Sequence, residues 1–197
     1  MTEHLRNTSE EVLWSAFQQG DEAAYALIYE RFVGGLYSYG RQFTKDVALV
    51  QDCIQDLFVT IWNNRRNLGQ AKSIKFYLNS SLKRELIRRL KASRTSLEEV
   101  EDDYIFGITL DIEAIRIQEE TNSEQLHRLN EALQKLPPRQ KEALYLRFYE
   151  NLSYDEIASL MEITSSVAYN FVYRGLSVLK KSFQATLKLL FLFFPIG

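Results

Sequence analysis

The 28 residues from Leu152 to Leu179 contain two helical repeats of apolar residues, separated by only a few residues. The first helix is predicted to begin at Ser153, because Ser153 and Glu156 have the spacing of a capping box. It ends near Met161, and Thr164 is predicted to cap the second helix. Two short amphipathic helices joined by so tight a turn fold either as a helix-turn-helix or as a plain αα-hairpin.

The second of these helices has an apolar face and a polar face. Small or apolar residues at helical spacing predict the buried face: Ala168, Phe171, Val172, Gly175, Leu176 and Leu179. The opposite face carries Ser165, Ser166, Tyr169, Asn170, Tyr173 and Arg174. Such groups can hydrogen-bond to base edges and phosphates in a DNA groove. This stretch alone does not exclude a hairpin without a DNA-binding role.

The composition narrows the class of protein. Eight glycines and three prolines are few for 197 residues, which favours an all-α fold. Cys53 is the only cysteine, so no disulfide can form within the chain, and a reducing compartment such as the cytoplasm is expected. The N-terminus is polar and predicts no export signal. The apolar run from Leu189 to Phe194 is far shorter than the ~20 residues of a transmembrane helix, so no transmembrane segment is predicted.

The sequence offers little for catalysis. The two histidines lack partners at ligand spacing, so we predict no metal site. We find no nucleophile–base pair and no Gly-rich phosphate loop, which argues against a hydrolase or transferase with an added DNA-binding domain. The sequence therefore predicts a protein without catalytic residues, cofactor or small-molecule substrate.

Charge is divided into two adjacent blocks of opposite sign. Between residues 63 and 94 there are ten cations and one acid, a net charge of +9. Between residues 96 and 124 there are ten acids and one cation, a net charge of −9. A basic block suits a polyanion, and an acidic connector suits a basic channel or limits indiscriminate binding by the basic block.

Four helices are predicted before the acidic block. Ser9 caps the first, and Asp21 caps the second, about residues 22–42, in which the pair Gly34 and Gly35 indicates a kink or a close helix crossing. Asp46 opens the third, about residues 47–64, whose polar face carries Gln51, Asp52, Gln55 and Asp56. Solvation alone could explain that face.

The fourth helix, about residues 73–92, interleaves cations and aromatic rings on its more exposed side. We expect this side to include Lys75, Asn79, Lys83, Arg84, Arg88 and Lys91, with Phe76 and Tyr77 close by. The candidates for DNA binding among them are Lys75, Phe76, Asn79, Lys83, Arg84 and Arg88. Single-stranded nucleic acid needs charge for its phosphates and ring faces for its unstacked bases. A solvated basic face is the alternative.

The chain is therefore predicted to form two small helical domains. An N-terminal helical bundle covers residues 1–95, and an acidic linker covers 96–122. A C-terminal helix-turn-helix domain covers 123–186, and an apolar tail covers 187–197. In the second domain a helix at about 123–136 is stopped by Pro137 and Pro138, and Pro138 suits the first turn of a helix that ends near Phe148.

Two sequence segments resemble those of bacterial sigma factors of the extracytoplasmic-function (ECF) group. The segment from Asp52 to Trp62 is similar to the family's D-L-V-Q-E-x-F-L-x-x-W helix, with Cys53 in place of the usual leucine. Residues 136–141 and 152–158 resemble the family's L-P-x-x-x-R and L-S-Y-x-E-I-A segments, with Lys141 in place of arginine. The resemblance covers nearly the whole chain except its tail.

The resemblance implies a non-enzymatic transcription initiation factor. It implies that Asp52, Gln55, Asp56 and Trp62 bind the β′ clamp helices of core RNA polymerase. It also implies that the basic fourth helix captures the melted −10 element of promoter DNA, that the linker threads toward the active-site cleft, and that the helix-turn-helix reads the −35 element. The residues expected to contact the −35 element are Arg139, Ser165, Ser166, Tyr169, Asn170, Tyr173 and Arg174. An anti-sigma factor is an additional partner that the sequence leaves open.

Two departures from the family pattern concern the DNA contacts. Lys83, Arg84 and Arg88 replace an Arg-Asn pair and a following Asp, and the recognition helix carries a single cation on its polar face where several are common. The main alternative function is a helix-turn-helix regulator that never engages core polymerase. The segment from Asp52 to Trp62 argues against it.

Overall fold

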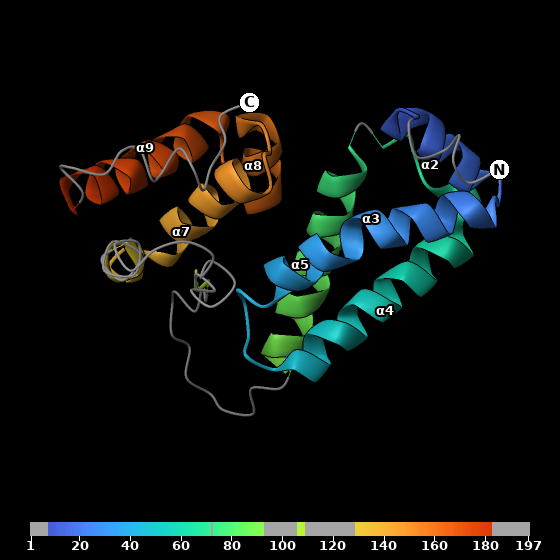
Figure 1. The fold of residues 1–197 in the computed structure, drawn as a ribbon, viewed down its shortest axis with the longest axis horizontal. Coiled ribbons are helices and arrows are strands. Elements are labelled where there is room, and N and C mark those ends of the chain that lie inside the picture. The colour runs from blue at the N-terminus through green and yellow to red at the C-terminus, as the bar shows by residue number, and fades with distance from the viewer. Residues whose placement is uncertain (1–7, 72, 93–105, 109–128, 183–197) are drawn as a thin grey trace, which may run out of the picture. The chain divides into compact units, whose positions relative to one another are not determined.

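The computed structural model describes residues 8–71, 73–92, 106–108 and 129–182. These residues are helices and connecting turns that belong to two compact units, residues 1–100 and 101–197 (Figure 1). The predicted all-α fold is confirmed. Most of the predicted linker 96–122, and all of the tail 187–197, lie outside the described residues.

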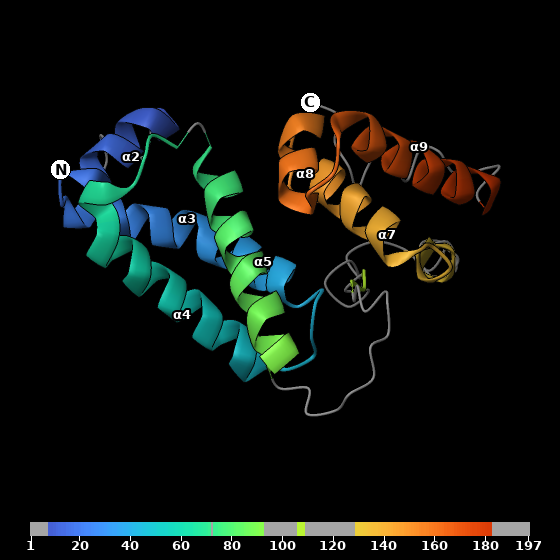
Figure 2. The same ribbon diagram turned by 180° about the vertical axis from the view of Figure 1, so that it is seen from behind.

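The described residues of the N-terminal unit form four α-helices and one short 3-10 helix. They are α2 (Glu10–Gln18), α3 (Glu22–Gly40), α4 (Val47–Asn64), η1 (Arg65–Asn67) and α5 (Ile74–Ala92). Helix α3 contacts α2, α4 and α5, and α4 also packs on α5 (Figure 2). The side of α4 that faces away from α3 and α5 is exposed in the part of the unit that the structure describes.

Local capping groups begin these helices where the sequence predicts. The hydroxyl of Ser9 and the carboxylates of Asp21 and Asp46 accept hydrogen bonds from the first-turn N–H groups of α2, α3 and α4. Helix α5 has a cap from a distant residue, because the carboxylate of Glu10 accepts a hydrogen bond from the Ile74 N–H at 2.8 Å. The start of α5 is thus fastened to α2.

A close helix contact in this unit occurs at Gly40 and not at Gly34 or Gly35. A Cβ added at Gly40 would lie 2.7 Å from Cγ1 of Val50, whereas one at Gly34 or Gly35 would have no atom within 4 Å. Helix α3 runs through both glycines. Of the two predicted alternatives, a kink or a close crossing at Gly34 and Gly35, the close crossing is wrong, because those positions have open space beside them.

The C-terminal unit contains the helix-turn-helix. Residues 129–134 are helical, and α7 (Pro138–Leu144), η2 (Tyr145–Tyr149), α8 (Tyr154–Met161) and α9 (Ser165–Ser182) follow. Helix α9 packs on α7 and α8, and a Cβ at Gly175 would lie 2.7 Å from Cδ1 of Leu144. A larger residue at 175 would separate α7 from α9.

The helix predicted to end near Phe148 is an α-helix only as far as Leu144 and continues as a π-helix. Residues Tyr145–Tyr149 form a π-helix, and Asn151 has a left-handed backbone with φ of 55°. The tight turn of the helix-turn-helix also uses a left-handed residue, Glu162 with φ of 56°. The sequence did not predict the left-handed backbone at either residue, because neither is a glycine.

Residues 106–108 belong to the C-terminal unit. Phe106 is only 2% exposed, and its ring lies 5.7 Å from that of Tyr145. The carbonyl of Ile108 accepts a hydrogen bond from Gln134 Nε2 at 2.8 Å. Part of the segment predicted as a linker is therefore an anchored element of the second unit.

No helix among the residues that the structure describes is long and apolar enough to cross a membrane. The same residues contain no group of three histidine, cysteine or acidic side chains that could hold a metal ion.

Candidate nucleic-acid and protein interfaces

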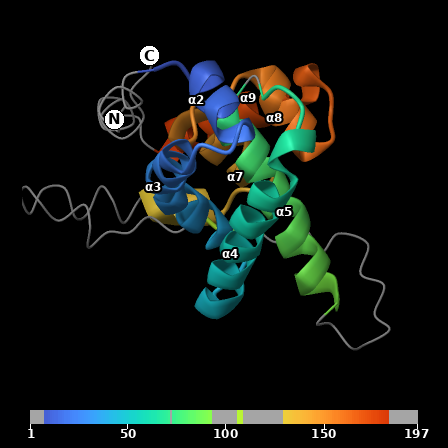
Figure 3. The same ribbon diagram turned by 90° about the vertical axis from the view of Figure 1, so that its right-hand side faces the viewer.

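Helix α4 has an exposed polar face opposite its buried face. Val50, Cys53, Ile54, Leu57, Phe58 and Ile61 point into the core. Asp52, Gln55 and Asp56 are exposed on the other side, together with Gln51 and Val59. Figure 3 shows α4 and α5 side by side, with α4 at the surface of the unit. The structure therefore brings Asp52, Gln55 and Asp56 to one accessible surface.

Trp62, unlike those three exposed residues, is partly buried against other side chains of the N-terminal unit. Its ring centroid is 4.8 Å from that of Tyr25, and the Arg65 guanidinium stands 4.2 Å above the ring. Arg65 Nη1 also donates a hydrogen bond to the Trp62 carbonyl at 2.7 Å. These contacts assign the Trp62 side chain chiefly to the packing of the N-terminal unit.

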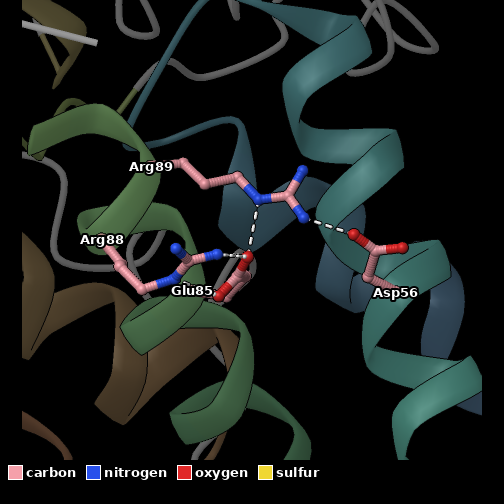
Figure 4. A network of polar contacts seen from close by, with 4 residues as sticks. All are labelled: Asp56, Glu85, Arg88 and Arg89. Carbon is pink, nitrogen blue, oxygen red and sulfur yellow. Dashed lines mark hydrogen bonds and ion pairs between the residues drawn. The ribbon is translucent and has the colours of Figure 1, made fainter. Parts of the chain in front are cut away.

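Four charged residues connect α4 to α5 (Figure 4). Arg89 of α5 pairs with Asp56 of α4, and its Nε lies 2.6 Å from Oε1 of Glu85. Arg88 also binds Glu85, with Nη2 2.6 Å and Nε 2.9 Å from its two carboxylate oxygens. Asp56 is thus exposed and at the same time held by a cation of its own unit, which periodicity could not reveal.

The two arginines stabilise the charged form of Glu85. Hydrogen bonds from Arg88, which has the larger effect, and from Arg89 lower the pKa of Glu85 to about 2. The pKa of the Arg89 guanidinium is raised, because Glu85 and Asp56 both accept hydrogen bonds from it. The hydrogen bonds of both arginines to Glu85 are therefore strongest while Glu85 is ionised.

Glu85→Gln tests the contribution of this arrangement. We expect a loss of about 1 kcal/mol in the free energy of unfolding at pH 7, because surface ion pairs contribute roughly 0.2–1 kcal/mol each. A carboxylate with a lowered pKa stabilises the fold above its unfolded pKa of about 4.3, and this stabilisation is lost as the pH falls toward 2. Urea unfolding between pH 7 and 2.5 should show the two proteins converging; a constant difference would contradict the assignment.

Some of the predicted DNA-binding residues of α5 lie at the surface, and others are buried in the core. Arg84 and Arg88 are exposed, and Lys75 and Phe76 are half-buried. Asn79 is 1% exposed and Lys83 is 6% exposed. These two side chains cannot present themselves to DNA in this structure. They lie next to the apolar series of α5, whose buried face is wide because α5 packs on both α3 and α4.

The helix-turn-helix has the predicted caps and faces. The Ser153 hydroxyl accepts from the Glu156 N–H, and Glu156 Oε2 accepts from the Ser153 N–H at 2.9 Å. The predicted buried face of α9 faces inward, with Ala168, Val172, Gly175 and Leu179 buried. The predicted polar face of α9 is exposed at Ser165, Ser166, Tyr169, Asn170, Tyr173 and Arg174. Val178, Lys180 and Lys181 are also exposed, closer to the C-terminal end of the helix. Arg139 is half-buried in the first turn of α7 and is not part of the exposed face of α9.

Two residues beside the recognition helix were not predicted as site residues. The Tyr154 ring meets that of Tyr169 edge-on at 5.4 Å, and the Arg147 guanidinium lies over the Tyr154 ring at 5.1 Å. Both residues precede α9 in sequence and join its exposed face only through folding. Their aromatic and guanidinium chemistry was visible in the sequence, but their neighbours were not.

Two helical units and an exposed helix-turn-helix face fit a DNA-binding protein, and comparison with known proteins identifies the family. Residues 28–95 match the family described as sigma-70 region 2. Residues 126–179 match sigma-70 region 4. The chain is 23% identical over 190 residues to RNA polymerase sigma-H factor of Pseudomonas aeruginosa, covering 93% of this chain and 98% of that protein. It is 21% identical over 169 residues to the ECF RNA polymerase sigma factor SigX of Bacillus subtilis, covering 83% and 85%.

Solved structures agree with this fold. The chain is similar to CnrH in complex with the cytosolic domain of CnrY, with a TM-score of 0.59, 17% identity, and coverage of 91% of this chain and 99% of that one. It is also similar to sigma factor RpoE in complex with the anti-sigma factor NepR from Bartonella quintana, with a TM-score of 0.59, 15% identity, and coverage of 82% and 98%. With region 2 and region 4 matched in order, the chain belongs to the ECF-type sigma factors.

Proposed function

We propose that this sigma factor binds core RNA polymerase through the exposed face of α4 and carries promoter DNA on α5 and α9. The observation that supports the first contact is the placement of Asp52, Gln55 and Asp56 on one accessible surface within the region 2 match. Two carboxylates and an amide suit a basic or polar partner helix, and the β′ clamp helices are the proposed partner. Trp62 supports this surface from within by packing on Tyr25.

The proposed −10 surface is smaller than the sequence predicts. It consists of Lys75, Phe76, Arg84 and Arg88 and omits the buried Asn79 and Lys83. Phe76 offers a ring face for an unstacked base, and the cations attract phosphates. Arg88 reaches the surface while bound to Glu85, so part of its charge is already compensated. We expect phosphate attraction here to depend mainly on Arg84 and Lys75.

The proposed −35 surface is the exposed face of α9. Asn170 can pair with adenine, and Arg174 can pair with guanine or a phosphate. With a single cation on this face, α9 has little affinity for DNA in general. The recognition helix therefore reads the −35 element when polymerase, bound through α4, brings it to the promoter.

Arg174→Ala tests the −35 contact. We expect the affinity of holoenzyme for a −35 duplex to fall by about 1–3 kcal/mol if the guanidinium binds a base through two hydrogen bonds. A fluorescence titration measures the change, and Lys180→Ala, near the other end of α9, is the matched control. Unchanged affinity would remove Arg174 from the reading face.

Run-off transcription tests the function as a whole. Holoenzyme reconstituted from this chain and core polymerase should initiate at specific sites on genomic fragments, whereas core alone should not. A pull-down with core distinguishes the alternative helix-turn-helix regulator, which would bind duplex DNA but not core. An anti-sigma factor is a further candidate partner, since one structural neighbour, sigma factor RpoE, was solved in complex with the anti-sigma factor NepR.

A further inference from the structure

Three tyrosine rings form a row across the helix-turn-helix. The row begins at Tyr154 in the first turn of α8, continues to Tyr169 and ends at Tyr173 of α9. The Tyr154 and Tyr169 ring centroids are 5.4 Å apart, and those of Tyr169 and Tyr173 are 6.3 Å apart with nearly parallel planes. Tyr169 is 52% exposed and Tyr173 is 60% exposed. The row is an apolar strip on the face that also carries Asn170 and Arg174.

The contacts behind the row fix its position. The Arg147 guanidinium lies over Tyr154, and Arg147 Nη1 donates a hydrogen bond to the Leu152 carbonyl at 3.0 Å. The capping box of Ser153 fixes the backbone at the start of α8. Tyrosine has few rotatable bonds, so a ring held at one edge presents its exposed face at low entropic cost. The strip is therefore preorganised for contact with a rigid apolar partner.

The chemistry of the neighbouring groups favours apolar contact over charge. Arg174 is the only cation between Ser165 and Leu179. The Ser165 hydroxyl is engaged by the Asp155 carboxylate at 2.5 Å, so it is not a ready donor to a base. The floor of the DNA major groove presents one apolar group, the 5-methyl group of thymine. A strip of tyrosine rings on a recognition helix matches that group.

We propose that Tyr169 and Tyr173, held in a row that starts at Tyr154, select thymine-containing −35 elements by packing on the thymine 5-methyl groups. This inference rests on the proposed reading of the −35 element by α9 and specifies its ligand. Tyr154 is a positioning residue in this arrangement, because it acts through Tyr169.

Uracil differs from thymine only by the missing methyl group and so provides a direct probe. Duplexes with a randomised −35 region are selected with holoenzyme assembled from the full chain and a bacterial core polymerase. The best duplex is then prepared with thymine and with uracil, and both are titrated by fluorescence anisotropy. We expect uracil to weaken binding about fourfold for each contacted methyl group.

Tyrosine variants connect the methyl dependence to the row. Tyr169→Ala should lose affinity and bind the two duplexes more equally, whereas Tyr169→Phe should keep the thymine preference because it keeps the ring. Tyr154→Ala should reduce the preference without abolishing binding. Tyr149→Ala is the matched control, because Tyr149 is 54% exposed, lies in the same unit and stacks on Tyr145 outside the row.

The outcomes separate this inference from the proposed function. Equal affinity for the two duplexes, an unchanged preference in Tyr169→Ala, or a selected −35 element without thymine would each overturn the inference while leaving promoter reading intact. If the tyrosine row contacts another protein and not DNA, the thymine and uracil duplexes will bind with equal affinity. If no −35 sequence is enriched at all, both the inference and the proposed reading by α9 fail.

Discussion

Core RNA polymerase is expected to lose its affinity for this sigma factor when Asp52 and Asp56 are both replaced by lysine. Both carboxylates are exposed on the proposed docking face of α4. Breaking interfacial charge pairs costs about 2–5 kcal/mol, so a double reversal should weaken binding roughly a thousandfold. Surface plasmon resonance with immobilised core measures the change.

The pairing of Asp56 with Arg89 determines the controls for this experiment. Lysine at 56 would face the Arg89 guanidinium, so part of any effect could come from a shift of α5. Thermal unfolding and the milder Asp52→Asn with Asp56→Asn separate the two causes. Glu22→Lys with Glu131→Lys makes the same charge change at exposed residues outside α4 and should leave binding unchanged. Full affinity in the Asp52 and Asp56 reversal would exclude this docking face.

Phe106→Ala should destabilise the C-terminal unit by about 3–4 kcal/mol, as expected for truncating a buried phenylalanine. Phe106 is buried against Tyr145 within a stretch that is otherwise strongly acidic. Loss of the ring should also release the Ile108 carbonyl from Gln134. Hydrogen exchange of residues 129–182 measures the effect as faster exchange in α7 and η2.

The controls for Phe106→Ala distinguish anchoring from general damage. Phe106→Leu retains most of the apolar contact and should cost much less. The N-terminal unit should keep its exchange rates in both variants, because Phe106 belongs to the other unit. Unchanged exchange in the C-terminal unit of Phe106→Ala would show that residues 106–108 are not an anchor and that the predicted linker extends through them.

Local signals in the sequence predicted the helices well. The predicted range of α4, residues 47–64, and the caps at Ser9, Asp21, Asp46 and Ser153 agree with the structure. Helix boundaries are predictable because a cap depends on residues three or fewer positions away. The π-helix at Tyr145–Tyr149 and the left-handed Glu162 were missed, since neither carries a distinctive local residue.

Burial of polar residues could not be predicted from periodicity. Periodicity placed the apolar residues of α5 correctly but assigned Asn79 and Lys83 to its exposed side. The width of a buried face depends on how many helices pack on it, and α5 contacts two long neighbours. In α4, which has an open side, the same reasoning placed Asp52, Gln55 and Asp56 correctly at the surface.

The sequence by itself determined the all-α fold, the helix-turn-helix and the membership in the sigma family, because these follow from patterns within short segments. Only the tertiary structure decided which residues share a surface. Asp56 meets Arg89 across two helices, and Tyr154 joins Tyr169 across a turn, although each pair is far apart in sequence. The crossing and rotation of packed helices set these contacts, and no local signal encodes them.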